Sequence, residues 1–128
     1  MFFGRPFYFG DSMTVGARNP EAAATWYRET FGLRRFKNSQ DGEIWLGSSE
    51  ERHSPTPDVA IVPMRSEDDW KSLPGHPIIF TRNIEKAHAW FSARISGTGS
   101  IQNDSGANAF FTFRDPEGDQ IEVCREPG

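Results

Sequence analysis

Two stretches that repeat each other decide the fold: N-P-E-A-A-A-T-W-Y at residues 19–27 and N-I-E-K-A-H-A-W-F at residues 83–91. They lie 64 residues apart and share Asn, Glu, Ala and Trp at matching positions, namely Asn19/Asn83, Glu21/Glu85, Ala23/Ala87 and Trp26/Trp90. A second match aligns residues 54–62 with residues 115–123 at a separation of 61. Two matches in the same order are better explained by internal duplication than by chance.

Each copy has the pattern strand, helix and three further strands. Asn19 and Asn83 are favoured helix N-caps, and Pro20 suits the first helical position. Gly32 and Gly97 are expected to end the two helices. Short strands bounded by Gly, Asp and Asn turns should follow each helix. The expected strands are 11–18, 33–38, 43–48 and 58–64 in the first copy, and 76–82, 99–103, 108–114 and 119–125 in the second.

The chain is therefore predicted to be a single α+β domain over residues 1–128, built from tandem βαβββ modules. The first module covers 11–64, a connection covers 65–75, and the second module covers 76–125. One helix can cover only one face of each sheet, so the other face should be covered by the second module or by a bound molecule. We expect a curled mixed sheet around a cleft that binds a small molecule.

Composition narrows the class of function. The 128 residues include 14 Lys and Arg against 18 Asp and Glu, for a net charge of −4, without a basic stripe for nucleic acid. No apolar run approaches the roughly 20 residues that cross a bilayer. The start, M-F-F-G-R-P-F-Y-F-G, is too short and broken for a secretory signal. A single cysteine, Cys124, suits a reducing compartment. A cytoplasmic protein is expected.

Alternation along the strands predicts which side chains face the cleft. Met13, Val15 and Ala17 form one apolar set, suited to packing under the helix. Ile121 and Val123 do the same in the last strand. Ile61 is expected in the cleft because it matches Glu122 in the second repeat. The other side chains predicted to face the cleft are Ser12, Thr14 and Arg18 in the first module, and His76, Ile78, Phe80, Arg82, Glu122 and Cys124 in the second.

His76 and Glu122 could form half of a metal site, because imidazole and carboxylate suit divalent first-row ions. Two protein ligands are too few, since catalytic sites usually supply three or more. A His–carboxylate hydrogen bond or a substrate contact without metal is the alternative. Acid–base catalysis by Glu122 with His76 is a third reading. Cys124 could act as a nucleophile only with a base, for which His76 is the visible candidate.

Aromatic side chains predict the kind of ligand. Trp45, Phe80 and Phe110 fall on inner sheet faces, with Phe36 a further candidate, and flat rings suit a planar ligand. Phe111 and Phe113 have the opposite parity and are expected in the core. The first nine residues contain five aromatics, so this arm should pack across the domain or onto a partner subunit.

The remaining charged candidates have simpler alternatives. Arg18 and Arg82 end the two cleft strands, where they could hold an anionic ligand or form salt bridges. His53 lies in a polar loop and should be solvated. His88 is expected to have a surface or helix-packing role.

The ending F-R-D-P-E-G-D-Q-I-E-V at residues 113–123 resembles the closing motif of the vicinal oxygen chelate superfamily. This group includes glyoxalase I, extradiol dioxygenases, and the fosfomycin and bleomycin resistance proteins. The stretches at 17–33 and 76–91 resemble its two strand-to-helix segments. The resemblance implies the paired βαβββ fold and a homodimer. It places His76 and Glu122 at metal-ligand positions, Ser12 where a His is usual, and Ile61 where glyoxalase I has a Glu.

The leading functional prediction is a small-molecule binding protein that resembles the bleomycin resistance group, with an aromatic-lined cleft and an incomplete metal site. The alternative is a divalent-metal-dependent enzyme of the lyase, isomerase or dioxygenase type, using His76 and Glu122. The expected cofactor is thus none or one divalent ion, and the expected ligand is aromatic or anionic. Whether the cleft lies within one chain or between two is left open.

Overall fold

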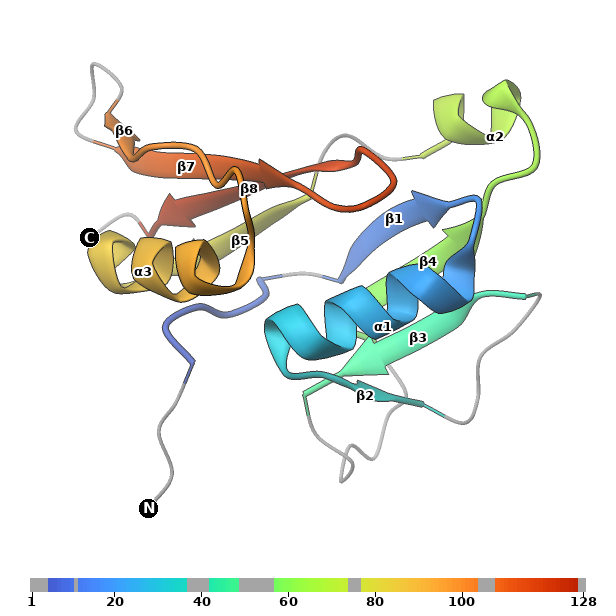
Figure 1. Cartoon of the computed structure of the whole chain (residues 1–128), viewed down its shortest axis with the longest axis horizontal. Coiled ribbons are helices and arrows are strands. Elements are labelled where there is room, and N and C mark those ends of the chain that lie inside the picture. The colour runs from blue at the N-terminus through green and yellow to red at the C-terminus, as the bar shows by residue number, and fades with distance from the viewer. Residues whose placement is uncertain are drawn as a thin grey trace.

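The computed structural model describes residues 5–10, 12–36, 42–48, 57–73, 77–103 and 108–126. It contains two four-stranded mixed sheets, with strand orders β1-β4-β3-β2 and β5-β8-β7-β6 (Figure 1). The elements are β1 (Met13–Ala17), α1 (Pro20–Phe31), β2 (Arg34–Arg35), β3 (Ile44–Gly47), β4 (Val59–Pro63), α2 (Glu67–Lys71), β5 (Ile78–Thr81), α3 (Ile84–Arg94), β6 (Gln102–Asn103), β7 (Ala109–Arg114) and β8 (Gln120–Arg125).

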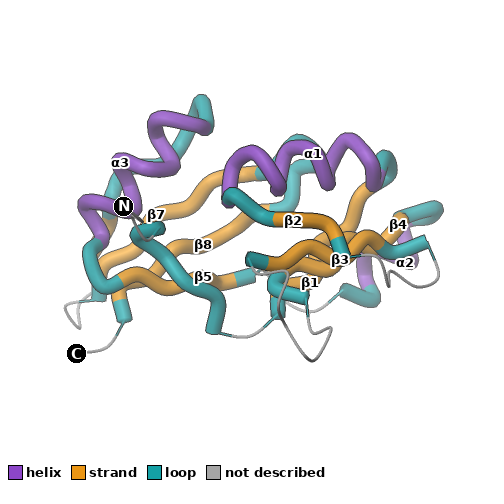
Figure 2. Tube along the Cα trace, turned by 90° about the horizontal axis from the view of Figure 1, so that it is seen from below, coloured by secondary structure: helices purple, strands orange, loops and turns teal. Residues whose placement is uncertain are grey.

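The predicted tandem βαβββ architecture is confirmed. In the first sheet β1 is parallel to β4, β4 is antiparallel to β3, and β3 is antiparallel to β2. In the second sheet β5, β8, β7 and β6 repeat the same arrangement. The strands form two distinct sheets, and Figure 2 shows α1 and α3 on the same side of both. The opposite faces of the two sheets therefore also point to a common side.

The helix starts follow the sequence prediction, and one helix end does not. Asn19 accepts a hydrogen bond from the Ala22 amide at 3.2 Å, and Asn83 accepts one from the Lys86 amide at 3.0 Å. Gly32 ends α1 in the left-handed conformation, with φ of 70°. Helix α3 ends earlier than expected, with the extended Ile95 as its C-cap. Gly97 was thus wrongly placed at the helix end and lies in the following turn.

The core lies between the helices and the sheets. Met13, Val15 and Ala17 are buried there, as are Ile121 and Val123. These assignments were all predicted from strand alternation, which sends every second side chain to the helix-covered face. Phe111 and Phe113 are buried on β7, also as predicted.

Residues 5–9 pack across the domain, which is the first of the two predicted placements of the aromatic arm. Phe7 is buried, with its ring 5.5 Å from that of Phe31 on α1 and 5.1 Å from that of Phe91 on α3. Tyr8 pairs with Phe80 on β5 through two backbone hydrogen bonds of 2.8 and 3.0 Å. The arm therefore fills the space between the two helices and pairs with the edge of β5.

The turn between β7 and β8 joins the second module to the first. The Glu117 carboxylate accepts hydrogen bonds from the backbone amides of Arg18 at 2.9 Å and Asn19 at 3.1 Å. The hydroxyl of Tyr27, buried on α1, donates to Asp115 Oδ2 at 2.6 Å. These contacts fix the start of α1 to the second sheet. Among the described residues no helix is long and apolar enough to span a membrane.

Candidate functional site

The face of the second sheet turned away from α3 brings together four of the predicted site residues. Phe80 on β5 and Phe110 on β7 are both paired with Cys124 on β8, so the three side chains form one row across the sheet. The next row contains Glu122, between Ile78 and Thr112. Phe80, Phe110, Glu122 and Cys124 are all half-buried. We call these four residues the aromatic–acid face.

Glu122 and Cys124 are in direct contact on this face. The Cys124 thiol donates to Glu122 Oε2, with Sγ and Oε2 2.7 Å apart. Residues two positions apart on one strand point to the same side of the sheet, which explains the contact. His76, the predicted partner of Glu122, lies outside the described residues, as does His53.

The corresponding face of the first sheet carries a different set. Thr14, Ala60 and Trp45 form a row across β1, β4 and β3. The Trp45 indole donates to Glu43 at 2.9 Å. The Phe36 ring packs against Gly47, which is two residues beyond Trp45 and so shares its face. Trp45 and Phe36 therefore have the inner orientation that was predicted for them.

Ile61 does not face the cleft, and that prediction was wrong. It is paired with Val15, is completely buried, and belongs to the core beneath α1. The residue equivalent to Glu122 is Ala60, because Ala60 pairs with Thr14 as Glu122 pairs with Ile78. The sequence alignment was off by one residue at β4, and a one-residue shift reverses the face of a strand.

Ser12 and the two arginines occupy the ends of the strands. The Ser12 hydroxyl donates to the carbonyl oxygen of Pro57. Arg82 forms an ion pair with Glu126 at 3.4 Å, and Arg18 forms one with Glu117 at 3.7 Å. The salt-bridge alternative is thus confirmed for both arginines. Tyr8 donates to Glu126 and stacks on Phe80, which extends the aromatic–acid face towards Arg82.

His88 has the packing role that was expected. Its Nε2 lies 2.8 Å from the carbonyl oxygen of Gly99, and its ring meets that of Phe111 edge-on at 5.0 Å. Because a carbonyl oxygen can only accept, Nε2 is the donor in this contact.

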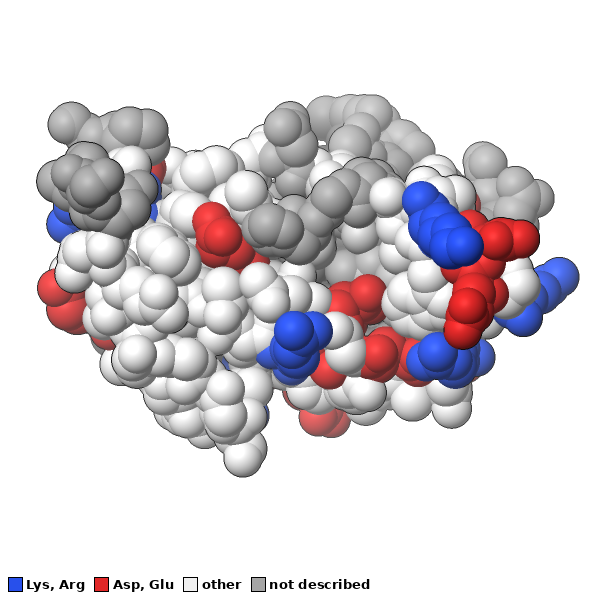
Figure 3. All heavy atoms as spheres, turned by 90° about the horizontal axis from the view of Figure 1, so that it is seen from above, with Lys and Arg blue, Asp and Glu red and all other residues white. Residues whose placement is uncertain are grey.

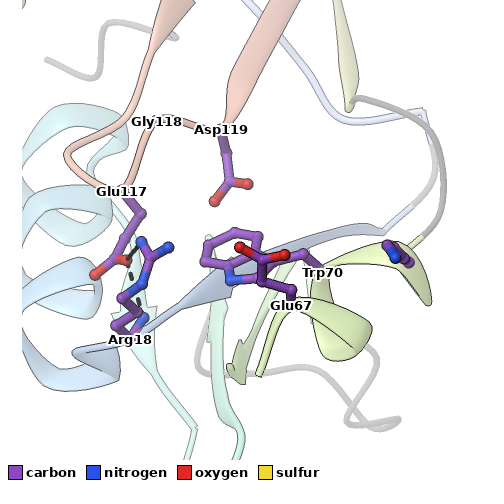
Figure 4. A pocket seen from close by; sticks show the side chains of 7 residues that line it. Arg18, Glu67, Trp70, Glu117, Gly118 and Asp119 are labelled. Atoms are coloured by element: carbon purple, nitrogen blue, oxygen red, sulfur yellow. Dashed lines mark hydrogen bonds and ion pairs between the residues drawn. The ribbon is translucent and has the colours of Figure 1, made fainter. Parts of the chain in front are cut away.

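A pocket of about 400 Å³ lies elsewhere, between the end of β1, helix α2 and the β7–β8 turn. Figure 3 shows acidic and basic side chains gathered towards the α2 end of the molecule. In the close-up of Figure 4, the Asp119 carboxyl group points from the β7–β8 turn into the pocket, and Trp70 and Glu67 come from α2 on the other side. The Arg18 guanidinium lies 5.1 Å from the centre of the Trp70 ring. We call this the α2 pocket; its lining residues are Arg18, Glu67, Trp70, Lys71, Glu117, Gly118 and Asp119.

Among the ionisable groups that line this pocket, Asp119 has the most strongly shifted pKa. The pKa of Asp119 is raised to about 7, and burial is the largest cause. The nearby Asp115 carboxylate and the hydrogen bond between the two carboxyl groups are the next largest causes. Glu117 raises it further, while the Gly16 amide opposes the shift. Asp119 Oδ2 is buried and has no hydrogen-bond partner among the described residues.

Comparison with known proteins gives the family. The profile of the Glyoxalase/Bleomycin resistance protein/Dioxygenase superfamily matches residues 11–123. The chain belongs to this superfamily. A search of curated proteins finds no match.

Several solved structures share the fold at low sequence identity. A superfamily member from Sphaerobacter thermophilus has a TM-score of 0.65 at 20% identity, covering 93% of this chain and 98% of its own. Lactoylglutathione lyase from Agrobacterium tumefaciens has a TM-score of 0.63 at 15% identity, covering 90% and 91%. TioX from Micromonospora sp. ML1 has a TM-score of 0.63 at 14% identity, covering 91% and 95%.

Glyoxalase-superfamily members often use a divalent metal, and the described residues alone do not supply a complete ligand set for one. Glu122 offers a carboxylate beside the Cys124 thiol, but the equivalent residue in the first sheet, Ala60, has no donor atom. The described residues contain no group of three His, Cys, Asp or Glu side chains suited to holding an ion. Because a metal site usually has three or more protein ligands, a metal on Glu122 would need donors from outside the described residues, such as His76.

The α2 pocket was missed by sequence reasoning. Its Trp70 lies in the predicted connection 65–75, where no repeat or periodicity drew attention to it. A signal was present, since Ser66 and Asp69 form a capping box that begins α2. This pairing, together with the acid-rich turn at residues 115–119, could have indicated an ordered structure.

Proposed function

We propose that this superfamily member is a small-molecule binding protein whose ligand lies on the aromatic–acid face. The observation that carries the proposal is the row in which Phe80 and Phe110 flank Cys124, one step from Glu122. Half-buried rings on a sheet face without a helix over it suit contact with a flat molecule. Glu122 supplies the polar group that would orient such a ligand.

The chemistry of the face favours a planar ligand with a hydrogen-bond donor. Phe80 and Phe110 offer ring surfaces, and Tyr8 adds a third ring stacked on Phe80 at 5.9 Å. An ionised Glu122 only accepts hydrogen bonds, so it selects N–H or O–H groups. An anionic ligand would have to compete with Glu126 for the Arg82 guanidinium at the end of this face, so a planar donor is favoured over an anion.

A fragment screen tests the proposal. Planar aromatic compounds with and without a donor group would be screened by thermal shift, and hits would be titrated calorimetrically. Phe110→Ala and Glu122→Gln should each weaken binding about tenfold or more, as losses of a ring contact and a charged hydrogen bond. Arg125→Ala is the matched control, because it changes the same strand at an exposed position of opposite parity. Equal weakening by all three variants would count against this face.

Metal-dependent catalysis on Glu122 and His76 is the alternative, and metal analysis separates it from ligand binding alone. Purified protein would be supplied with zinc, nickel, manganese and anaerobic iron, dialysed and analysed. Stoichiometric metal that disappears in both His76→Ala and Glu122→Ala would support the enzyme and overturn the binding-protein proposal. Metal-free acid–base catalysis by the same pair would be assayed on whichever ligand the screen identifies.

We also propose a homodimer, as superfamily proteins often form dimers. The described surface includes two large exposed hydrophobic side chains, Tyr8 and Ile78, each 40% exposed. Both belong to or adjoin the aromatic–acid face, so a partner subunit could cover it. Light scattering of the purified chain should give twice the mass of 14.5 kDa. A monomeric mass at micromolar concentration would contradict the dimer and leave the ligand site within one chain.

A further inference from the structure

The α2 pocket is a second site, separate from the aromatic–acid face in both position and chemistry. It is formed by three elements that are distant in sequence: the end of β1, the short α2, and the β7–β8 turn (Figure 4). Its volume of about 400 Å³ lies within the range of small-molecule sites. None of the residues of the aromatic–acid face lines it.

The charges of the pocket favour a cation. Three carboxylates line it, from Glu67, Glu117 and Asp119, against the two cations Arg18 and Lys71. Both cations already have acidic partners, since Arg18 pairs with Glu117 at 3.7 Å and Lys71 pairs with Asp68 at 3.8 Å. The pocket therefore retains an excess of negative charge when its own ion pairs are counted.

The Asp119 carboxyl group faces the pocket. Asp119 is only partly buried and lines the pocket, and Figure 4 shows its carboxyl group directed into it. A carboxylate accepts hydrogen bonds, so a ligand N–H in the pocket would find an acceptor at this point. Glu67 lies across the pocket from it and adds a second carboxylate.

The Trp70 side chain supplies an aromatic surface to the pocket. The Trp70 indole faces Asp119 in Figure 4, and the Arg18 guanidinium lies 5.1 Å from its ring centre. Attraction between cations and the indole ring is strongest for tryptophan among the aromatic side chains. The contact with Arg18 demonstrates that this ring accepts a cation in this setting.

We propose that the α2 pocket binds a small organic molecule with a primary ammonium group, which donates to the Asp119 carboxyl group and packs its apolar part against Trp70. A carboxylate or phosphate ligand would meet three carboxylates and two cations that are already paired. A neutral alcohol could donate to Asp119 but would gain nothing from the negative charge. The ligand class is thus set by a donor and a positive charge on the same atom.

Calorimetric titration of the full chain at pH 8 tests this ligand class with three matched probes. Benzylammonium carries the donor and the charge, benzyl alcohol carries only the donor, and benzoate carries the opposite charge. Benzylammonium should bind at least about tenfold more tightly than either of the others, as expected for a charge-assisted hydrogen bond. Absence of benzylammonium binding at millimolar concentration, or tighter binding of benzoate, would overturn the proposal.

Variants locate the site. Asp119→Asn should weaken benzylammonium binding about tenfold or more. Glu85→Gln is the control, because it removes an exposed carboxylate on α3 that does not line the pocket; it should change affinity less than twofold. Should Asp119→Asn fail to fold, the exposed Glu67→Gln carries the test, with about two- to fivefold weaker binding expected. Unchanged affinity in Glu67→Gln and in a folded Asp119→Asn would contradict the site.

The pH dependence gives a readout that a structural role of Asp119 would not produce. The ionised carboxyl binds an ammonium ion, and the pKa of Asp119 is raised to about 7. The groups that surround it are Asp115 and Glu117 in the turn, Arg18 at the end of β1, Glu67 and Lys71 on α2, and the Gly16 amide. Benzylammonium affinity should therefore fall about tenfold from pH 8 to pH 6. The fall should be absent in Asp119→Asn, and an equal fall there would overturn the assignment.

Failure of this proposal is distinguishable from failure of the proposed function. Phe110→Ala and Glu122→Gln, which test the aromatic–acid face, should leave benzylammonium affinity within twofold. Asp119→Asn should likewise leave the affinity of planar fragment hits unchanged. If Phe110→Ala weakened benzylammonium binding as strongly as Asp119→Asn does, the two sites would be one, and the separate α2 site would be overturned.

Discussion

Ala60 and Glu122 occupy equivalent positions in the two sheets. Ala60 pairs with Thr14 on the parallel strand β1, and Glu122 pairs with Ile78 on β5, which is 64 residues further along than Thr14. The duplicated fold thus places a methyl group in one module where the other has a carboxylate. This asymmetry bears directly on function, because a metal shared between the modules would have to take its first-module ligand from a position other than Ala60.

The register of β4 predicts that substitutions at Ile61 and at Ala60 lower stability by very different amounts. Ile61→Ser should lower the free energy of unfolding by about 3–5 kcal/mol, because it leaves a cavity and a hydroxyl in the core. Ala60→Ser should cost less than about 1 kcal/mol, since it adds one polar atom outside the core cluster. Urea denaturation of both variants measures the difference. Similar losses for the two would contradict the assigned faces.

The two tyrosine hydroxyls that bind carboxylates should contribute very different amounts of stability. Tyr27→Phe leaves the buried Asp115 Oδ2 without its hydroxyl donor, so we expect a loss of about 1.5–3 kcal/mol. Tyr8→Phe removes an exposed hydrogen bond to Glu126 and should cost less than about 0.5 kcal/mol. Chemical denaturation gives both values. A larger loss for Tyr8→Phe would mean that the β7–β8 turn is not held by Tyr27.

The helix starts and the buried strand faces could be predicted because each depends on local chemistry. Asn19 and Asn83 cap their helices through their own side chains, and alternation alone assigns Met13, Val15 and Val123 to the core. The register of β4 depends instead on hydrogen bonds to β1, which lies more than forty residues away. The repeat alignment could not detect a shift of one residue there, and Ile61 was assigned to the wrong face as a result.

For the functional site too, features that follow from local patterns were predicted, and features that depend on tertiary contacts were not. Parity placed Phe80, Phe110, Glu122 and Cys124 on one face, and strand pairing then brought them into adjacent rows. The Ser66–Asp69 capping box signals helix α2, but the position of the pocket depends on where the connection carrying Trp70 packs relative to the β7–β8 turn. That arrangement comes from tertiary contacts rather than from any local pattern around Trp70.

The aromatic arm should contribute strongly to stability through one residue. Phe7→Ala removes a ring that is 7% exposed and in contact with both helices, so a loss of about 3–4 kcal/mol is expected. Phe9→Ala removes a partly buried ring and should cost less, about 1–2 kcal/mol. Thermal and urea unfolding measure both. Equal, small losses would show that the arm lies on the surface without joining the core.

Stability should also depend on pH through Asp119. The pKa of its carboxyl group is raised to about 7 in the folded protein, above its value of about 4 in an unfolded chain. The folded state therefore binds more protons than the unfolded state between these values, and its stability decreases as the pH rises from 4 through 7. Asp119→Asn is uncharged at every pH and should lack this contribution.

The measurement is the difference in unfolding free energy between the wild-type protein and Asp119→Asn across that range. Taking the difference cancels the contributions of other titrating groups, apart from those of Asp115 and Glu117, which interact with Asp119 directly. The variant should gain stability relative to the wild type as the pH rises, with most of the change complete by pH 8. A difference that stays constant from pH 5 to pH 8 would mean that Asp119 is already ionised at pH 5. The ammonium site would then lose its expected pH dependence as well, since both follow from the same carboxyl group.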